Sequence, residues 1–272
     1  MERRVQALSP SSATLADLHL HTNRSDGAMA VAPLLAHVHR RTPLAIVAIT
    51  DHDELAAAVE AWTRVRDLPP GSGPRVIVGS EVTASWGRHL VALFPRPPFP
   101  ARPLPRYRSL LETTARIRDL GGLVIVPHPA TPLVPSLSES DVRCLSDAGL
   151  PVDGIEVCTG SIGGRRREGR MRTLAREVGA ATIGSSDAHH LAHVGKAVTV
   201  VPAGDGDVVE RVVEAIRSRE IGAAWGVAGR IGPRSVLAQA GRAWALNPAR
   251  ELGAAMQAIL ARRRWRLGFR PR

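Results

Sequence analysis

Short apolar segments alternate with amphipathic segments along most of this 272-residue chain. The apolar segments are rich in β-branched residues and bounded by turn-forming residues, which is typical of strands. We expect strands at residues 14–19, 44–50, 75–83, 89–94, 123–127, 154–159, 181–185 and 197–201. Between them, apolar residues recur at helical spacing, and we expect helices at residues 31–41, 54–67, 107–120, 139–147, 167–178 and 207–219.

This alternation predicts the fold class. Strands that alternate with helices are typical of α/β proteins with parallel sheets. The segment 44–50 is apolar on both faces, as a parallel strand covered by helices should be. About seven such units over roughly 200 residues favour a barrel. We therefore expect one barrel over residues 14–222, preceded by an N-terminal extension of residues 1–13.

The pattern changes in residues 223–272. Asn247-Pro248 resembles a helix start, and apolar residues then recur at helical spacing up to Leu260, followed by Arg262–Arg264. This segment holds ten arginines and one acidic residue, Glu251, so it carries most of the formal net charge of +11. We expect a basic amphipathic helical tail. Three roles stay open for it: packing against the barrel, contact with a membrane surface or partner, and binding of nucleic acid.

Composition excludes several classes of protein. No apolar run approaches the roughly 20 residues that span a bilayer, and no secretory signal follows the N-terminus. The two cysteines, Cys144 and Cys158, form no disulfide framework. We therefore expect a cytoplasmic protein without a transmembrane segment. Aromatic residues make up 3% of the chain, which argues against a protein built on base-stacking platforms.

The placement of histidine is the most informative chemical feature. In a parallel barrel the carboxyl ends of the strands form the active-site face, so side chains at these ends converge. Imidazole and carboxylate together suit Zn, Mn or Fe, and no thiolate joins them. Seven of the ten histidines lie at or just past strand ends: His19, His21, His52, His89, His128, His189 and His190. The carboxylates among them are Asp17, Asp26, Asp51, Asp53, Glu81 and Asp187.

Two His-x-His pairs differ in their expected geometry. His19 and His21 lie on a predicted strand, where residues two apart point to the same face and can share one ion. His37 and His39 lie in a predicted helix, where two residues turn about 200° and the rings diverge. We interpret the second pair as surface or partly packed side chains, and His193 as structural.

Five motifs occur in a recognisable order: Asp17-Leu-His-Leu-His-Thr-Asn-Arg-Ser-Asp-Gly27, Ile49-Thr-Asp-His-Asp53, Val78-Gly-Ser-Glu-Val82, Val126-Pro-His-Pro129 and Gly184-Ser-Ser-Asp-Ala-His189. Together they resemble the motifs of the PHP (polymerase and histidinol phosphatase) family. The resemblance implies a distorted (β/α)7 barrel that carries up to three divalent ions. It implies one ion on His19, His21, Glu81 and Asp187, a second on Glu81, His89 and His128, and a third on Asp26, His52 and His189.

The same residues indicate a reaction. Two ions bridged by Glu81 can hold a hydroxide at neutral pH, which would attack phosphorus. The ions outweigh their carboxylates in charge, which favours a phosphate ester as the substrate. Arg24 could clamp a phosphate, and His190 could act as the acid for the leaving group or orient a neighbour. A basic cluster follows the strand at 154–159 and could also reach phosphate: Arg165, Arg166, Arg167 and Arg170.

Three functions remain open from the sequence. The leading hypothesis is a metal-dependent phosphomonoesterase that acts on nucleotides or another small phosphorylated metabolite. The second is a 5′–3′ exonuclease-like phosphodiesterase that acts on short RNA or DNA, with the basic tail as a nucleic-acid contact. The third is a non-catalytic, metal-dependent binding or regulatory module. The sequence has no nucleophile elbow and no P-loop, which argues against serine hydrolase and ATP-driven chemistry. The oligomeric state stays open.

Overall fold

The computed structural model describes residues 13–131, 136–161 and 163–226. The tail helix expected after Asn247 and nearly all of the N-terminal extension lie outside these residues. The helices are α1 (Val31–Arg41), α2 (Ala56–Val65), α3 (Leu110–Asp119), α4 (Glu139–Asp147), α5 (Gly164–Val178) and α6 (Val208–Ser218), with short 3-10 turns η1 (Ser85–Gly87) and η2 (Leu191–His193). The strands are β1 (Ala13–Leu20), β2 (Ile46–Ile49), β3 (Arg75–Thr83), β4 (His89–Phe94), β5 (Leu123–Val126), β6 (Gly154–Thr159), β7 (Ala181–Ser185), β8 (Ala197–Pro202) and β9 (Gly222–Trp225).

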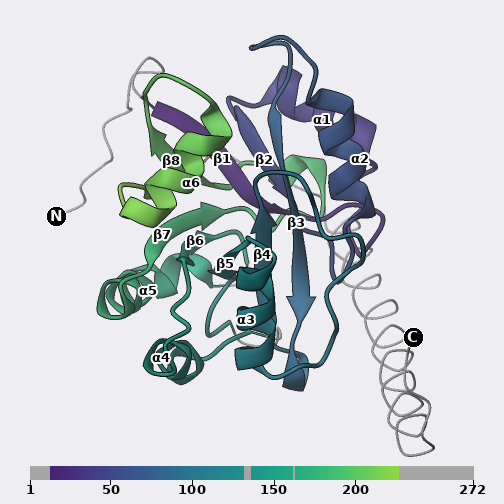
Figure 1. The fold of residues 1–272 in the computed structure, drawn as a ribbon. Coiled ribbons are helices and arrows are strands. Elements are labelled where there is room, and N and C mark those ends of the chain that lie inside the picture. The colour runs from purple at the N-terminus through teal and green to yellow at the C-terminus, as the bar shows by residue number, and fades with distance from the viewer. Residues whose placement is uncertain (1–12, 132–135, 162, 227–272) are drawn as a thin grey trace, which may run out of the picture. The chain divides into compact units, whose positions relative to one another are not determined.

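The described strands form one sheet in the order β7-β6-β5-β4-β3-β2-β1-β8-β9 (Figure 1). The α/β barrel expected from the sequence is confirmed, but its strands are not all parallel. β4 runs antiparallel to both β3 and β5, and β8 runs antiparallel to both β1 and β9. The strand β9 was not expected from the sequence, and it continues the sheet to Trp225.

The sheet curls until β7 approaches β1 and β8. A parallel bridge joins Leu20 to Ala188, and the amide of His21 donates to the carbonyl of Ala188 at 3.0 Å. The hydroxyl of Thr199 on β8 donates to the carbonyl of Gly184 on β7 at 2.8 Å. A Cβ at position 184 would lie 2.1 Å from the Val198 carbonyl oxygen, so only glycine allows this approach. The sheet is therefore a nearly closed barrel.

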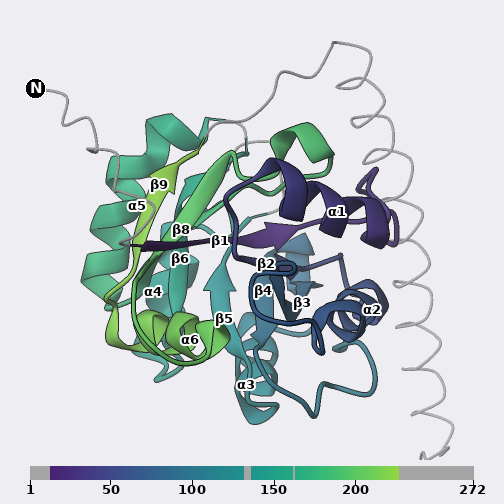
Figure 2. The same cartoon turned by 90° about the horizontal axis from the view of Figure 1, so that it is seen from above.

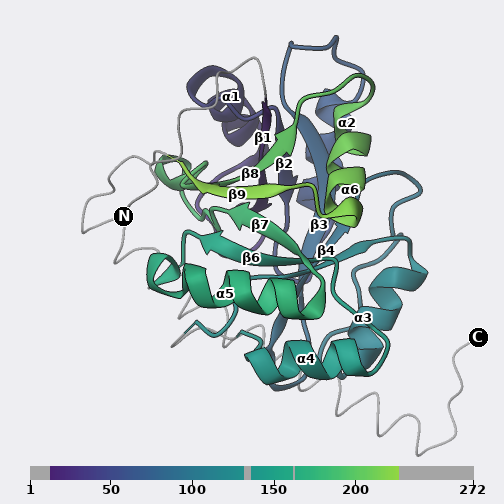
Figure 3. The same ribbon diagram turned by 90° about the vertical axis from the view of Figure 1, so that its left-hand side faces the viewer.

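Two apolar clusters stabilise the barrel. The inner cluster includes Ile77 and Leu93, and α6 packs on it through Val212 and Ile216. The outer cluster lies between the sheet and the remaining helices. In Figure 2, α1 and α2 lie on one side of the barrel and α5 lies on the opposite side. Figure 3 shows α5 alongside β6 and β7, with α4 next to it.

Most helix boundaries have local causes. α3 and α4 begin with capping boxes, in which the Ser109 and Ser138 side chains accept from backbone amides three residues on. Asp207 caps α6 in the same way, accepting from two amides. α5 ends at Gly179, which has a φ of 67°. Within the described residues, no helix combines the length and the apolar character needed to cross a bilayer.

Candidate metal centre

The predicted ligand residues meet at one end of the barrel. β1 supplies His19, and the loop that follows it supplies His21 and Asp26. β3 supplies Glu81, and the loops after β2, β5 and β7 supply His52, His128, Asp187 and His189. His89 is different, because it begins a strand rather than ending one. It still reaches this end because β4 runs against its neighbours, so its amino end lies beside their carboxyl ends. The structure thus brings together all nine residues: His19, His21, Asp26, His52, Glu81, His89, His128, Asp187 and His189.

A β-bulge aims the first two histidines into the barrel. Asp17 pairs with Val47 and Leu20 with Ile49, so β1 has one more residue than β2 over this stretch. The extra residue shifts the alternation of side chains. Leu18 belongs to the inner apolar cluster before the bulge, and Leu20 belongs to the outer cluster after it. His19 therefore faces the interior, although strict alternation from Leu18 would point it outward.

The tightest group of ligand atoms includes His19 and His21. Their Nε2 atoms are 2.9 Å apart, and both lie 3.2 Å from Glu81 Oε2. Asp187 Oδ1 lies 3.7 Å from His19 Nε2 and 3.4 Å from His21 Nε2. Both imidazoles are buried. Two nitrogens and two carboxylate oxygens therefore surround one small volume, which is a donor set that suits a divalent ion.

Glu81 lies between two groups of imidazoles. Its Oε2 atom faces His19 and His21, and it also lies 3.3 Å from His52 Nδ1. Its Oε1 atom lies 2.9 Å from His89 Nδ1 and 3.1 Å from His128 Nε2. The carboxylate is 1% exposed, so it is nearly shielded from water. This is the geometry of a carboxylate that can bridge two cations.

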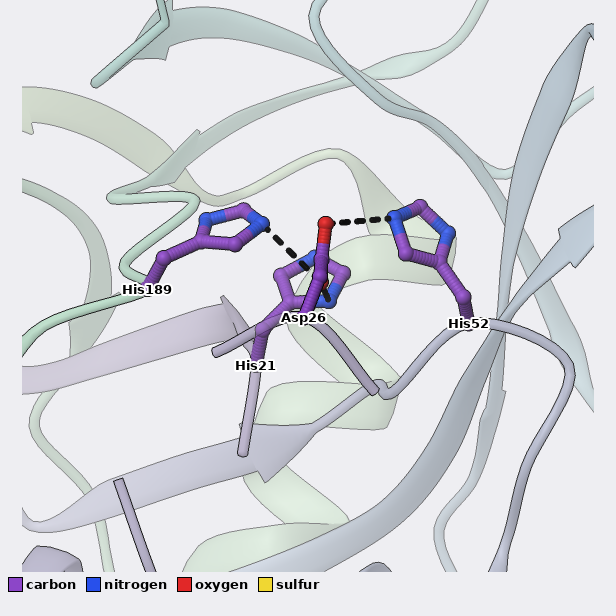
Figure 4. Close-up of side chains that lie close together, drawn as sticks. All are labelled: His21, Asp26, His52 and His189. Atoms are coloured by element: carbon purple, nitrogen blue, oxygen red, sulfur yellow. Dashed lines mark ion pairs between the residues drawn. The ribbon is translucent and has the colours of Figure 1, made fainter. Parts of the chain in front are cut away.

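A third group surrounds Asp26 (Figure 4). Its Oδ1 atom lies 3.2 Å from His189 Nε2 and 3.5 Å from His21 Nδ1, and its Oδ2 atom lies 3.6 Å from His52 Nε2. The ligand atoms of these four residues all lie within 4.8 Å of one another. The family resemblance groups Asp26, His52 and His189, and the structure adds His21, whose two nitrogens face different groups.

The buried carboxylates of the cluster stabilise positive charge on the neighbouring imidazoles. Burial alone would lower the pKa of His19, but the charges of Glu156, Glu81 and Asp187 raise it well above its usual value. Burial also acts against protonation of His21, yet hydrogen bonds that its ring donates to the carboxylates of Asp187 and Glu81 raise its pKa to about 10. Burial would raise the pKa of Glu81, but His89, His52 and His19 hold it well below the usual range.

Several buried atoms in the cluster lack a hydrogen-bond partner. They include Asp26 Oδ1, His89 Nδ1 and His128 Nδ1. His89 Nδ1 lies 2.9 Å from Glu81 Oε1, and Asp26 Oδ1 lies 3.2 Å from His189 Nε2, but neither contact has the geometry of a hydrogen bond. Unsatisfied buried polar atoms are costly, so their concentration here needs an explanation. Asp26 and His89 belong to groups of converging ligand atoms, where a shared cation would use their lone pairs, whereas His128 Nδ1 is the ring nitrogen that does not face Glu81. The residues present therefore fit divalent metal ions.

The backbone at the cluster is strained. His128 has a φ of 30° and Asp187 a φ of 52°, in the left-handed region that non-glycine residues rarely occupy. Such conformations persist where surrounding contacts impose them, and they are frequent at functional sites. At His128 the contact is a hydrogen bond from its amide to Glu156 Oε2 at 2.8 Å.

Sequence reasoning missed Glu156. This carboxylate lies on β6 and is 1% exposed. Its Oε1 atom lies 2.8 Å from His19 Nδ1 and its Oε2 atom accepts from the amide of His128. It therefore orients two ligands at once, as partners of metal-binding histidines commonly do. The available signal was an acidic residue within an otherwise apolar strand, because a buried charge without a partner is too costly to keep.

Two further buried aspartates hold the ligand loops. Asp17 accepts from the amides of Ser186 and Gly195, both at 2.9 Å, and so fixes the loop that carries Asp187. Asp51 accepts from the amide and hydroxyl of Thr22 at 2.7 and 2.6 Å, and it also accepts from the hydroxyl of Ser25. Those bonds fix the turn that carries Asp26. The sequence located both carboxylates near the strand ends without assigning them this role.

The predicted phosphate-binding arginines lie in different environments. Arg24 has a 60% exposed side chain and lies 4.0 Å from Glu60 of α2. Arg170 forms an ion pair with Glu139, and Arg165 stacks on Trp225 at 4.3 Å. Arg166 is exposed.

Arg167 is the member of this set that turns toward the ligand loops. It is half-buried, and its guanidinium donates to Thr131 Oγ1 at 2.7 Å. The Thr131 hydroxyl in turn donates to the carbonyl of the ligand residue His128. His190 is half-buried, and its Nδ1 accepts from the amide of Ala192 at 3.3 Å.

Comparisons with known proteins concern the family and the fold of this chain. A family model for PHP-associated proteins matches residues 166–221. The uncharacterized protein MJ1587 of Methanocaldococcus jannaschii is 30% identical over 152 residues, which cover 52% of this chain and 80% of that protein. The chain belongs to the PHP family.

A second curated relative is the 3′,5′-nucleoside bisphosphate phosphatase of Chromobacterium violaceum. It is 41% identical over 78 residues, but these cover 28% of this chain and a quarter of that enzyme.

Solved structures share the fold at low sequence identity. A two-domain protein of Bacteroides vulgatus, containing a predicted PHP-like metal-dependent phosphoesterase, superimposes with a TM-score of 0.62 at 19% identity. The match covers 80% of this chain and 66% of that one. The lesion-specific endonuclease EndoQ of Pyrococcus furiosus gives a TM-score of 0.57 at 17% identity, over 81% of this chain and 60% of that one. At these identities the likeness concerns the barrel fold.

Proposed function

We propose that this chain hydrolyses phosphate monoesters of nucleotides or other small phosphorylated metabolites with divalent ions bound at the barrel mouth. The observation that carries the proposal is the convergence of nine histidine, aspartate and glutamate side chains with unsatisfied buried atoms. The partial similarity to a nucleoside bisphosphate phosphatase supports a phosphorylated nucleoside as the substrate class.

The arrangement supports up to three ions. His19, His21 and Asp187 would hold one, with Glu81 beside it. His52, Glu81 and His89 would hold the second, with His128 on the same Glu81 oxygen. The third would take His21, Asp26, His52 and His189. These donors suit Mn, Zn or Fe. Bound divalent ions neutralise the charge of phosphate oxygens and lower the pKa of water, which supplies a nucleophile at neutral pH.

The chain itself orients the reacting groups. Glu156, Asp17 and Asp51 fix the ligand residues from behind, so little reorganisation is needed when substrate binds. Arg167, next to the His128 loop, offers a planar guanidinium for a phosphate oxygen. The hydrogen bond that His190 Nδ1 accepts places the proton of the neutral ring on Nε2. In that tautomer Nε2–H can donate a hydrogen bond to a leaving oxygen, whereas transfer of a proton would require the ring to be protonated on both nitrogens.

The test is phosphate release from a panel of nucleoside mono- and bisphosphates, sugar phosphates and short oligonucleotides, with Mn²⁺ or Zn²⁺. We expect inorganic phosphate from small monoesters, and loss of release with His52→Ala. His39→Ala is the matched control, because His39 is exposed on α1 and we expect full activity. Absence of release from every member of the panel would contradict the proposal.

The same panel separates the alternatives. Progressive shortening of a labelled oligonucleotide without release from small monoesters would indicate the exonuclease-like reaction. Bound metal without turnover of any compound would indicate a binding or regulatory module.

Arg167 and Arg170 form a second matched pair. We expect Arg167→Ala to raise the KM for phosphorylated substrates about 10- to 150-fold, by loss of one charged hydrogen bond of roughly 1.5–3 kcal/mol. Arg170→Ala should leave KM unchanged, because Arg170 is exposed and forms an ion pair with Glu139. Equal KM values for the two variants would exclude Arg167 from phosphate binding.

A further inference from the structure

The turn between β3 and β4 projects from the mouth of the barrel. Thr83, the last residue of β3, pairs with His89, the first residue of β4. Both Glu81 and His89 belong to the ligand cluster, so the turn leaves the sheet directly beyond it. Trp86 lies at the middle of this turn, three residues from His89, which limits the separation of their Cα atoms to about 10 Å.

Trp86 exposes an unusual amount of apolar surface. Its side chain is 90% exposed, whereas the other exposed large apolar residues of the described chain, Leu68 and Leu111, are 38% and 41% exposed. Aromatic residues are scarce in this protein, at 3% of the sequence. A tryptophan in water forgoes more burial energy than any other side chain would, because its ring is the largest. Because Trp86 lies in the turn next to the ligand cluster, we expect a bound molecule to cover its ring.

The backbone holds Trp86 in place at an energetic cost. Its φ of 65° and ψ of 21° are left-handed, which is a genuine outlier for a bulky residue. The turn is braced on both sides. The amide of Ser85 donates to the carbonyl of Arg108 at 2.7 Å, and Arg88 donates to the Ser85 carbonyl at 3.1 Å while it pairs with Asp141 of α4. A glycine would adopt this turn without strain, so the geometry favours a role for the ring itself.

We infer that Trp86 is a stacking platform for an aromatic ring in the leaving group of the substrate, so that phosphorylated nucleosides are preferred over sugar phosphates. The inference rests on the proposed phosphoesterase function. Charge supports an uncharged flat group at this place, because the nearby cations Arg88 and Arg106 already pair with Asp141 and Asp53. A nucleobase stacks on tryptophan through its π-face without needing charge. A single stacking residue beside the site requires no other aromatic residue, so it is consistent with the low aromatic content of the chain.

The kinetic test compares a nucleoside 5′-monophosphate with ribose 5-phosphate, which has the same sugar phosphate without the base. We expect Trp86→Ala to lower kcat/KM for the nucleotide about 5- to 100-fold, mainly through KM. The same variant should leave ribose 5-phosphate unchanged, and Trp86→Phe should keep most of the nucleotide activity. Leu111→Ala, another exposed apolar residue, is the matched control and should alter neither substrate.

A binding measurement tests the platform without turnover. Titration of the full chain with the unphosphorylated nucleoside should quench tryptophan fluorescence, and Trp86→Phe should remove that quench although four other tryptophans remain. Equal losses of kcat/KM on both substrates, or no loss on either, would overturn the inference and leave Trp86 as a structural or protein-contact residue. If the wild-type chain releases no phosphate but the quench depends on Trp86, the proposed reaction fails and the platform stands.

Discussion

The same three-residue pattern occurs twice in this chain with opposite outcomes. His19-Leu20-His21 lies at the end of β1, where both rings are buried and their Nε2 atoms are 2.9 Å apart. His37-Val38-His39 lies on α1, where His37 is half-buried and His39 is exposed. The composition of the two segments is alike, but a strand repeats every two residues and a helix every 3.6. A His-x-His pair is therefore informative only together with the secondary structure that carries it.

The carboxylate surroundings separate the two pairs further. Hydrogen bonds that the His21 ring donates to Asp187 and Glu81 overcome the effect of burial and raise the pKa of His21 to about 10. At His37, burial and the nearby Arg41 lower the pKa instead. Carboxylates therefore face His21, whereas a cation lies near His37. Substitutions in one histidine pair, with the other pair kept, test this difference.

The largest effect is expected from His21→Ala. His21 is buried and faces two of the three ligand groups, so its loss affects more than one ion position. We expect activity to fall by more than the roughly 100-fold that marks the loss of an outer-shell partner. Metal content, measured by mass spectrometry of the purified chain, should fall in parallel. Full metal content in the variant would show that the strand pair does not bind metal.

Glu156→Gln should have the next largest effect. Glutamine keeps the size of the side chain but removes the charge that faces His19. Outer-shell partners of this kind typically contribute 10- to 100-fold to metal affinity or activity, and we expect a loss in that range. A competition assay with a metal chelator measures the affinity. An unchanged affinity would mean that Glu156 serves only the His128 backbone, to which it also bonds.

The metal-free chain should show opposite titrations for the two pairs. The folded-state pKa of His21 lies above the unfolded value of about 6.5. Its contribution to stability is therefore complete below about pH 6.5 and is lost as pH rises toward and through 10. His37 has a lowered pKa, so its protonation opposes folding as pH falls below 6.5.

Nuclear magnetic resonance of the imidazole protons in chelator-treated protein follows both titrations. His21→Ala and His37→Ala identify the two signals by their disappearance. If both rings titrated near pH 6.5, the predicted electrostatic difference between the two pairs would be wrong.

The smallest effect is expected from the double substitution of His37 and His39 by alanine. Substitutions at the surface usually change stability by less than about 0.5 kcal/mol, and alanine favours a helix. Metal content and phosphate release should match those of the unchanged chain. Urea denaturation measures the stability. A loss of metal from this variant would mean that the helical pair contributes to binding.

Part of the fold was predictable because its causes are local. Helices α1 and α4 begin and end where their apolar spacing predicted, and the eight expected strands are present. The antiparallel course of β4 was not predictable from its sequence. Its residues 89–94 are apolar on both faces, and such a strand fits either direction in a covered sheet. β9 was missed because Gly222-Ala-Ala-Trp225 has little β propensity of its own and gains its structure by pairing with β8.

The candidate site shows the same division. The sequence by itself determined which ligand-type residues lie near strand ends, because spacing and residue type are local properties. Only the tertiary structure decided that His19 turns inward at a bulge, that His89 reaches the mouth from a reversed strand, and that Glu156 supports two ligands. These three features depend on contacts between residues distant in the chain. No local pattern records them, since each is decided by which strands become neighbours when the sheet closes.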